Sequence, residues 1–311
     1  MEFKLTSLGT ASALPNPKRY SSAHVISIRG HLFLIDCGEG CQIQMCRKGI
    51  SITKIEGILI SHIHGDHMFG IFGLLSTMAL LGRTAPLAIA APESFRVVMD
   101  FFNEHFAEGV KFDINFIPLT NKEPATIISH RSFIIQAFPL VHKIETYGYL
   151  FREKEPARNI RKWKIEADSL SLKEIAQLKN GENVTRENGE VLEVEDYTYI
   201  PFSPRSFAYC SDTMPFPELI PWIKGVSLLY HEATFGDDKE AKASEYFHST
   251  ARQAGRVAKE AGVGKLVIGH YSTRYPDLNV LLSQAKEEFP ETYLSDDGLS
   301  FEIPIKRKTK N

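Results

Sequence analysis

The residues whose chemistry is most evident form one short run, His62-Ile63-His64-Gly65-Asp66-His67, directly after an apolar stretch with the composition of a strand. Residues two apart on an extended chain point to the same side, so His62 and His64 can bind one metal ion together. The glycine then permits a sharp change of direction, which aims Asp66 and His67 at a second cation nearby. The spacing therefore predicts a site for two divalent metal ions.

Two metal ions need more ligands than one run supplies, and we expect the others at the ends of other strands. His142, Asp212 and His270 are each the first strongly coordinating residue after an apolar stretch. Because a rigid sheet presents its strand ends at one edge, these three side chains can converge on the same ions.

Charge and ligand count suggest how the ligands divide. We assign His62, His64 and His142 to the first ion and Asp66, His67 and His270 to the second, with Asp212 as the bridge. Imidazole and carboxylate ligands favour zinc over magnesium, with manganese or iron as alternatives. Two such ions about 3.5 to 4 Å apart are expected to share a hydroxide, which is the nucleophile for attack on a phosphate.

A histidine close to a carboxylate predicts a second kind of chemistry. His231 and Glu232 follow a strand-like stretch, and His248 opens a helical one. Held by Glu232, His248 can stay protonated near neutral pH and donate a proton to a leaving alkoxide. Simple capping of the helix is the alternative for His248, and His231 is either a buried structural histidine or a support for the site.

The elements that position these residues alternate between strand-like and helix-like patterns. We expect strands at Phe3 to Leu8, His24 to Ser27, His31 to Ile35, Gly57 to Ile60, Leu87 to Ala90, Lys111 to Ile117, Ser132 to Phe138, Ser206 to Cys210, Val226 to Tyr230, Lys265 to Ile268 and Ser300 to Pro304. We expect helices at Phe69 to Leu81, Pro92 to Phe106 and Ser249 to Ala261, the last capped by Ser249 or Thr250 and ended by Gly262. Many strands with interspersed helices predict a layered α/β (α+β) fold in which residues 1–311 form one domain.

One stretch, Arg152 to Thr198, has few of the β-branched runs seen elsewhere, and we interpret it as an arm inserted into this domain. The first part of the arm is basic, and the second part, from Glu182 to Asp196, is acidic. We expect a helix near Leu170 to Leu178 and a hairpin around Asn188-Gly189.

The net charge of −2 over 311 residues offers no global positive field to attract nucleic acid. This total combines unlike parts, because Arg152 to Lys164 and Lys306 to Lys310 each carry +4, which leaves −10 for the rest. No stretch is long or apolar enough to span a bilayer, and the N-terminus lacks the apolar segment of a signal peptide, so we expect a cytoplasmic protein with no membrane partner. The absence of CxxC spacing predicts inert buried thiols at Cys37, Cys41, Cys46 and Cys210.

Together these residues resemble the metallo-β-lactamase superfamily and, within it, the ribonuclease Z family of tRNA 3′-processing endonucleases. The run from His62 to His67 specifies only the superfamily. The narrower resemblance rests on Leu8-Gly9-Thr10, Pro15, Arg19, Asp36-Cys37-Gly38-Glu39, Ser211-Asp212-Thr213, His231-Glu232-Ala233-Thr234, His248-Ser249-Thr250 and Gly269-His270-Tyr271-Ser272 with Arg274 and Tyr275.

The resemblance implies a four-layer αββα sandwich with two zinc ions at one edge. It also implies a homodimer in which the arm of one subunit grips precursor tRNA while the other subunit cuts after the discriminator nucleotide, leaving a 3′ hydroxyl. Asp66 would then also be the general base, with Glu232 and His248 as the proton relay. Ser211, Thr213 and Arg274 become candidate substrate-binding residues.

The arm departs from the pattern of this family. Bacterial members commonly carry a Gly-Pro-rich segment where Arg158 to Ile175 has no glycine or proline, whereas Leu178 to Val184 matches the far end of their arm. The candidates for binding tRNA phosphates are Arg158, Arg161, Lys162 and Lys164, with Trp163 among them to stack on the tRNA. A solvated helix surface is the alternative for these residues.

The leading hypothesis is a zinc-dependent endoribonuclease acting on precursor tRNA. A general metal-dependent phosphodiesterase or small-molecule hydrolase on the same site is the alternative, and a β-lactamase is disfavoured by the cytoplasmic character of the N-terminus. A metal-free binding protein is poorly supported, because all seven expected ligands are present. The sequence identifies no protein partner.

Overall fold

The computed structural model describes residues 2–307 and divides them into two compact units. The first unit comprises residues 2–129, 134–151 and 206–303, and the second comprises residues 130–133, 152–205 and 304–307. Within the basic stretch at the C-terminus, positions 308–310 lie outside the described residues. No helix in the described range is both long and apolar enough to cross a membrane.

Two seven-stranded sheets form the centre of the first unit. The first sheet has the order β18-β1-β2-β3-β4-β5-β6, made of β1 (Phe3–Gly9), β2 (Ala23–Ile28), β3 (His31–Ile35), β4 (Ile55–Leu59), β5 (Leu87–Pro92), β6 (Ile114–Leu119) and β18 (Ser300–Glu302). The second has the order β17-β16-β15-β14-β9-β8-β7, made of β7 (Ala125–Ser129), β8 (Phe133–Pro139), β9 (Tyr147–Glu153), β14 (Ser206–Cys210), β15 (Leu228–Glu232), β16 (Leu266–Gly269) and β17 (Thr292–Leu294).

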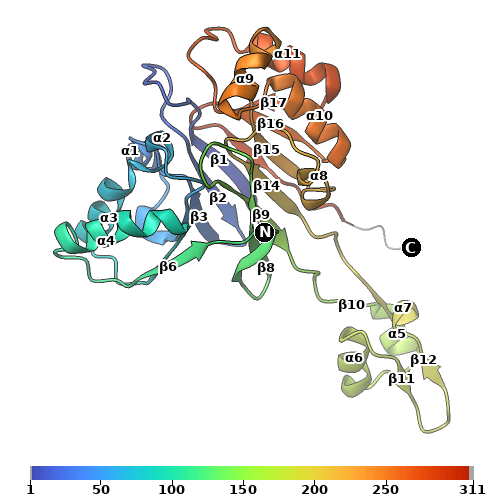
Figure 1. The fold of residues 1–311 in the computed structure, drawn as a ribbon. Helices are drawn as coiled ribbons and strands as arrows, with labels where there is room; N and C mark the ends of the chain where they lie inside the picture. Colours follow the sequence, from blue (N-terminus) through green and yellow to red (C-terminus); the bar gives the residue numbers. More distant parts are fainter. Residues whose placement is uncertain (1, 308–311) are drawn as a thin grey trace. The chain divides into compact units, whose positions relative to one another are not determined.

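Helices cover the outer face of each sheet (Figure 1). Those on the first sheet are α1 (Cys41–Arg47), α2 (Gly65–Met68), α3 (Ile71–Leu80) and α4 (Arg96–His105), with the short turns η1 (Ile52–Lys54) and η2 (Glu93–Phe95). Those on the second are α8 (Leu219–Trp222), α9 (Glu240–Tyr246), α10 (Ala251–Ala261) and α11 (Asn279–Glu288), with the turn η3 (Asp237–Lys239). The expected αββα layering is confirmed.

Each sheet packs a separate apolar core against its helices, which fixes the strand ends rigidly. In the first core, Leu74 and Met78 of α3 pack with Ile58 of β4, the strand that leads into His62. In the second core, glycine at position 255 lets α10 lie very close to α11, since a Cβ atom there would come within 2.6 Å of the Ala285 carbonyl oxygen. The helices therefore pack tightly against the outer face of each sheet.

Parallel pairing brings the strand ends that carry chemistry to one edge. β14, β15 and β16 run parallel to one another, with Cys210 opposite His231 and Glu232 opposite Gly269. The residues that follow β14 and β16 therefore emerge beside the end of β15. β3 and β4 are likewise parallel, so the segments after Ile35 and Leu59 leave the first sheet together.

The expected strands are all present, with bounds that differ by a few residues. Thr250 caps α10 through a capping box, and Gly262 ends it in the left-handed conformation, as predicted. The helix expected from Phe69 begins only at Ile71, and the one expected from Pro92 begins at Arg96, because Pro92 still belongs to β5.

Several elements gave no recognisable pattern in the sequence. β9 is buried on both faces along most of its length, so its residues show no alternation.

The prediction of buried thiols is correct for Cys37, Cys41 and Cys210 but wrong for Cys46, which is exposed. The exposure arises because Cys46 lies on α1, and a helix on the outer face of a sheet turns part of its surface to solvent.

The arm folds around a core of its own within the second unit. Its elements are β10 (Asn159–Ile160), α5 (Lys162–Ala167), α6 (Leu172–Lys179), β11 (Val184–Thr185), β12 (Val191–Leu192), α7 (Val194–Tyr197) and β13 (Thr198–Tyr199). The helix α6 and the β11–β12 hairpin, turning at Gly189 with φ +84°, confirm the two predictions for this stretch. The buried apolar residues are Leu170, Leu178, Val184, Leu192, Val194 and Tyr197.

Candidate metal centre

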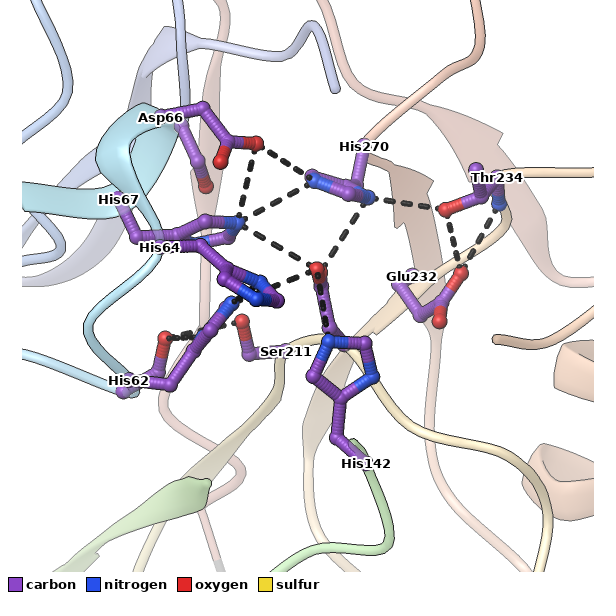
Figure 2. A network of polar contacts seen from close by, with 12 residues as sticks. His62, His64, Asp66, His67, His142, Ser211, Glu232, Thr234 and His270 are labelled. Atoms are coloured by element: carbon purple, nitrogen blue, oxygen red, sulfur yellow. Dashed lines mark hydrogen bonds and ion pairs between the residues drawn. The ribbon is translucent and has the colours of Figure 1, made fainter. Parts of the chain in front are cut away.

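Histidines and aspartates from separate strand ends converge on one buried point between the sheets. Those labelled in Figure 2 around this point are His62, His64, Asp66, His67, His142 and His270. The ligand atoms fall into two groups, His62, His64, His142 with Asp212, and Asp66, His67 with His270; each group lies within 4.8 Å. The sequence assigned the same members to its two ions.

Asp212 occupies the position between the two groups. Its Oδ2 lies 3.6 Å from Nε2 of His62 and 3.6 Å from Nε2 of His67, which belong to different groups. Asp212 also forms a third group with His248 and His270. A carboxylate in this position can reach both ions.

Four of the five ligand histidines are oriented by a hydrogen bond on the side of the ring away from the centre. Nδ1 of His67 donates to Oδ2 of Asp36 at 2.8 Å, and Nδ1 of His142 donates to the Phe247 carbonyl at 3.0 Å. His62 and His270 make the equivalent contacts to the hydroxyls of Ser61 and Thr234, both at 2.9 Å. Their Nε2 atoms are thereby turned toward the centre, as second-sphere hydrogen bonds do in metal sites.

The imidazole nitrogens at the centre face one another in pairs, and two further ligand atoms beside them have no partner. Nε2 of His62 faces Nδ1 of His64 at 2.9 Å, and Nε2 of His67 faces Nε2 of His270 at 3.2 Å. Among the described residues, Nε2 of His142 and Oδ1 of Asp212 are buried without a hydrogen-bond partner. Buried polar atoms are rarely left unsatisfied, so this set has the chemistry of ligands for divalent metal ions.

The electrostatics of the cluster agree with this interpretation. Burial lowers the pKa of His62, His64 and His142, so these imidazoles are neutral and keep a lone pair for a metal. Burial also opposes a charge on His67, but nearby carboxylates, Asp66 first among them, outweigh it and raise the pKa of His67. Several buried carboxylates surround the single His67 imidazole, so bound cations would neutralise negative charge at this site.

Backbone strain is concentrated at this site. Among the described non-glycine residues with positive φ are Asp36 at 56°, Phe247 at 59° and His270 at 60°. Phe247 adopts this conformation at the end of α9, which directs its carbonyl to His142. Such left-handed residues are costly and persist where the surrounding structure requires them, commonly at functional sites.

Glu232 and His248 form a hydrogen-bonded pair beside the metal ligands. Nδ1 of His248 lies 2.8 Å from Oε1 of Glu232, whose side chain is fully buried and also accepts from the backbone amides of Thr213 and Thr234. Burial opposes the charge on His248, but the Glu232 carboxylate outweighs it and raises the pKa of His248 to about 9. His248 does not act as the helix cap, because Thr250 does.

An open cavity of about 580 Å³ leads to this centre. Its lining includes His64, Asp66, His142, Asp212, His248 and His270 together with Arg274, which is exposed. Ser211 and Thr213 lie elsewhere: both are buried, and their hydroxyls bond to Ser61 and to the backbone at Met214. His231 is also buried, with Nδ1 on the Glu232 carbonyl, which matches the structural interpretation.

Asp36 is the supporting residue to which sequence reasoning gave no role. It accepts hydrogen bonds from the amide of Ser61, from His67 and from the hydroxyl of Tyr209. Its place directly after a strand, like that of Asp212, was the available signal. Thr234 was also given no individual role, and nothing in its local sequence indicates that its hydroxyl would bond both Glu232 and His270.

In the arm, the basic candidates differ in what surrounds them. Lys164 forms an ion pair with Asp168 at 3.4 Å and lies over the Tyr197 ring. Arg161 and Lys162 instead line a cavity of about 700 Å³ together with Trp163, whose side chain is 64% exposed. The helical surface here is thus partly neutralised and partly open to a ligand.

Comparison with known proteins matches the whole chain to one group of enzymes. Ribonuclease Z of Phocaeicola vulgatus is 39% identical over 302 residues, covering 97% of this chain and 98% of that protein. Ribonuclease Z of Cytophaga hutchinsonii is 43% identical over 304 residues, covering 97% of each. A family model described as anti-Pycsar protein Apyc1 matches residues 3–112 only, which is less than half of the chain.

Solved structures give the same result for the fold. Human tRNase Z, short form, has a TM-score of 0.69 and 26% sequence identity, covering 97% of this chain and all of that one. The metallo-β-lactamase fold protein YhfI of Bacillus subtilis also has a TM-score of 0.69, at 18% identity and 97% coverage of this chain, so its similarity concerns the fold alone. The ligand-bearing strand ends, the αββα layers and the full-length relatives agree: this chain belongs to the ribonuclease Z family of the metallo-β-lactamase superfamily.

Proposed function

We propose that this protein is a zinc-dependent endoribonuclease that removes the 3′ trailer of precursor tRNA, cutting after the discriminator nucleotide and leaving a 3′ hydroxyl. The observation that carries the proposal is the pair of ligand groups, with Asp212 3.6 Å from a histidine of each, lining an open cavity. Relatives of this chain along its full length are named ribonuclease Z, which supports the same reaction.

We assign two zinc ions to the cluster, the first to His62, His64 and His142, the second to Asp66, His67 and His270, and both to Asp212. The preponderance of imidazole nitrogen supports zinc, with manganese or iron as the alternatives. Bound there, the cations would supply a nucleophile from water at neutral pH and stabilise charge on the phosphate.

Asp66 is proposed as the general base. Burial disfavours its charge, but His67 and His270 outweigh burial and lower the pKa of Asp66, so the carboxylate is ionised. Its Oδ2 lies 3.4 Å from Nε2 of both histidines, and the side chain lines the cavity, where it can reach the attacking water.

At the opposite side of the phosphate, His248 is proposed as the proton donor. Cleavage breaks the bond between phosphorus and the 3′ oxygen of the discriminator ribose, and that oxygen needs a proton to leave. Nδ1 of His248 is held by Glu232, so Nε2 remains to donate to the 3′ oxygen. Glu232 orients the imidazole and stabilises its charge.

Substrate binding outside the centre is assigned to Arg274 and to the arm. Arg274 lines the cavity, with its guanidinium 3.1 Å from the Ser272 hydroxyl. Arg161, Lys162 and Lys164 are proposed to bind tRNA phosphates, and Trp163 offers a stacking surface. Ser211 and Thr213, being buried, are assigned the support of the Asp212 loop instead of substrate contact.

We further propose a homodimer in which the arm of one subunit serves the metal centre of the other. A test uses two variants that cleave the precursor poorly at low substrate concentration, His64→Ala in one subunit and Arg161→Ala with Lys162→Ala in the other. Copurified mixed dimers recover cleavage only if the intact arm and the intact centre act across subunits. Mixed dimers no more active than the parents would refute this arrangement.

The test of the function uses a precursor tRNA with a 3′ trailer, with product ends mapped at nucleotide resolution. The expected product ends at the discriminator with a 3′ hydroxyl. Hydrolysis of bis-p-nitrophenyl phosphate without cleavage of the precursor would overturn the proposal in favour of a general phosphodiesterase. Fewer than one metal ion per chain in carefully purified, active protein would count against the metal assignment.

A further inference from the structure

The His248 ring lies close to the rings of both His142 and His270, at centroid distances of 5.1 Å and 5.7 Å. Lys143 and Tyr246 line the cavity close in sequence to His142 and His248, whereas residues 12–14 line it near His270, because the amide of Ser12 donates a hydrogen bond to the Tyr271 carbonyl. A strand of RNA crossing the centre can therefore place the nucleotides on the two sides of the cut against different groups.

Near His248, an exposed aromatic ring of the cavity lining lies close to two cations. Tyr246, the last residue of α9, is 38% exposed and lines the cavity. The ammonium of Lys143 lies 4.2 Å from the ring centroid, and that of Lys242 lies 5.5 Å from it. Lys143 directly follows the ligand His142, and Lys242 and Tyr246 both belong to α9. The group formed by Tyr246, Lys143 and Lys242 is therefore held near the centre by two separate segments of the chain.

This group contributes little to the fold. Tyr246 belongs to neither apolar core of the first unit, and both lysines lie at the cavity wall. An exposed ring flanked by ammonium groups is the combination that holds single-stranded nucleic acid, in which bases stack on aromatic faces and phosphates meet cations. Two lysines beside one ring also suit a single nucleotide with its 5′ phosphate.

We propose that Tyr246 with Lys143 and Lys242 forms the subsite for the discriminator nucleotide, the one on the 5′ side of the cut. The inference rests on the proposed function, because it uses the position of His248 as the donor to the leaving 3′ oxygen. When the bond between phosphorus and that oxygen breaks, the proton goes to the oxygen and the phosphate stays on the trailer. The nucleotide carrying the leaving oxygen therefore lies beside His248 and Tyr246, and the proposal places the trailer toward residues 12–14 and Arg274.

The chain provides a matched control for Tyr246. Tyr293 on β17 is also 38% exposed and also has a cation over its ring, the ammonium of Lys265 at 5.6 Å from the centroid. It does not line the cavity. Tyr293→Ala therefore removes the same kind of ring and contact without touching the proposed subsite.

The experiment measures kcat/KM on three precursors: one intact, one with an abasic discriminator nucleotide and one with an abasic first trailer nucleotide. On the intact precursor, Tyr246→Ala should lower kcat/KM by roughly 10- to 100-fold, the range for loss of one base stack. On the abasic discriminator the substitution should have almost no further effect, whereas on the abasic trailer it should keep its full effect. Tyr246→Phe should restore the wild-type values, and Tyr293→Ala should retain them.

Two results would overturn the subsite. A full effect of Tyr246→Ala on the abasic discriminator would show that the ring does not stack on that base, and an effect lost on the abasic trailer instead would place the other nucleotide there. Metal content and thermal unfolding of Tyr246→Ala establish that the variant is folded. If the wild-type protein fails to cut the intact precursor after the discriminator, the proposed function itself fails, and the subsite with it.

Discussion

Carboxylates are held differently in the metal centre and in the arm. In the centre, Asp36 is fully buried and accepts hydrogen bonds from an amide, an imidazole and a phenol. In the arm, Glu195 pairs with Arg158 and Glu174 with Arg186, and Glu195 is mostly exposed. Fixed buried groups cost reorganisation energy when they are disturbed, whereas exposed ion pairs are screened by water and salt.

The comparison teaches that the two regions should respond to different perturbations. Catalysis should depend on the exact placement of single groups in the centre and respond weakly to salt. Recognition by the arm should depend on the number of available cations and respond strongly to salt.

The largest effect is expected from Asp212→Ala. Loss of the carboxylate that lies between the two ligand groups should lower precursor cleavage by about a thousandfold or more, as for other residues that act as a unit. Metal content should fall as well, while tRNA affinity stays near the wild-type value. The exposed Asp277→Ala is the control, and a large loss of tRNA affinity in Asp212→Ala would contradict the separation of the two regions.

His248→Ala should lower precursor cleavage by roughly 10²- to 10³-fold, the usual range for a general acid. Hydrolysis of bis-p-nitrophenyl phosphate should fall far less, because p-nitrophenolate leaves without a proton. Equal losses on both substrates would exclude the donor role and leave a structural one.

The pH dependence of precursor cleavage tests the donor role of His248 in a second way. Glu232 raises the pKa of His248 to about 9, so the imidazole is protonated at neutral pH and loses its proton as the pH rises through that value. Bound cations lower the value, so precursor cleavage should decline at or below about pH 9. This alkaline limb should be absent for the p-nitrophenyl ester, and its persistence there would assign the limb to another group.

A smaller effect is expected from removing charge in the arm. Arg161→Ala, Lys162→Ala and Lys164→Ala together should weaken tRNA binding by roughly 10- to 100-fold and reduce the slope of log affinity against log salt by about two to three. Turnover of the small ester should be unchanged. The control removes three exposed lysines from the first unit, Lys111, Lys224 and Lys286. An equal loss in the control would mean that binding follows total charge and not the arm.

The smallest effect concerns the stability of the arm in acid. The hydrogen bond from Arg186 lowers the pKa of Glu174 to about 2, so this pair stabilises the fold above pH 4.5 and its contribution is lost as the pH falls toward 2. Fluorescence of Trp163 in a Trp222→Phe background should report this change locally. Glu174→Gln should remove the dependence between pH 4.5 and 2, and an unchanged titration would rule out this pair as its source.

The elements that could be predicted from the sequence are those that adjacent residues decide. Patterns carried by adjacent residues, such as the capping of α10 by Thr250 or the hairpin around Gly189, were recognisable because local sequence decides them. β9 was not recognisable, because burial on both faces removes the alternation that identifies a strand. The exposure of Cys46 was missed because the side of a helix that faces solvent depends on the sheet beneath it.

The ligand types, their grouping into two sets and the family were evident from the amino-acid sequence, because metal chemistry restricts which side chains stand at strand ends. The partners that orient those ligands became evident only in the folded chain, among them Asp36 on His67, Thr234 on His270 and the Phe247 carbonyl on His142. Folding also brings Lys143 beside Tyr246, although about one hundred residues separate them. Such pairings depend on the parallel strands and on the packing of α9, which no local pattern in the chain encodes.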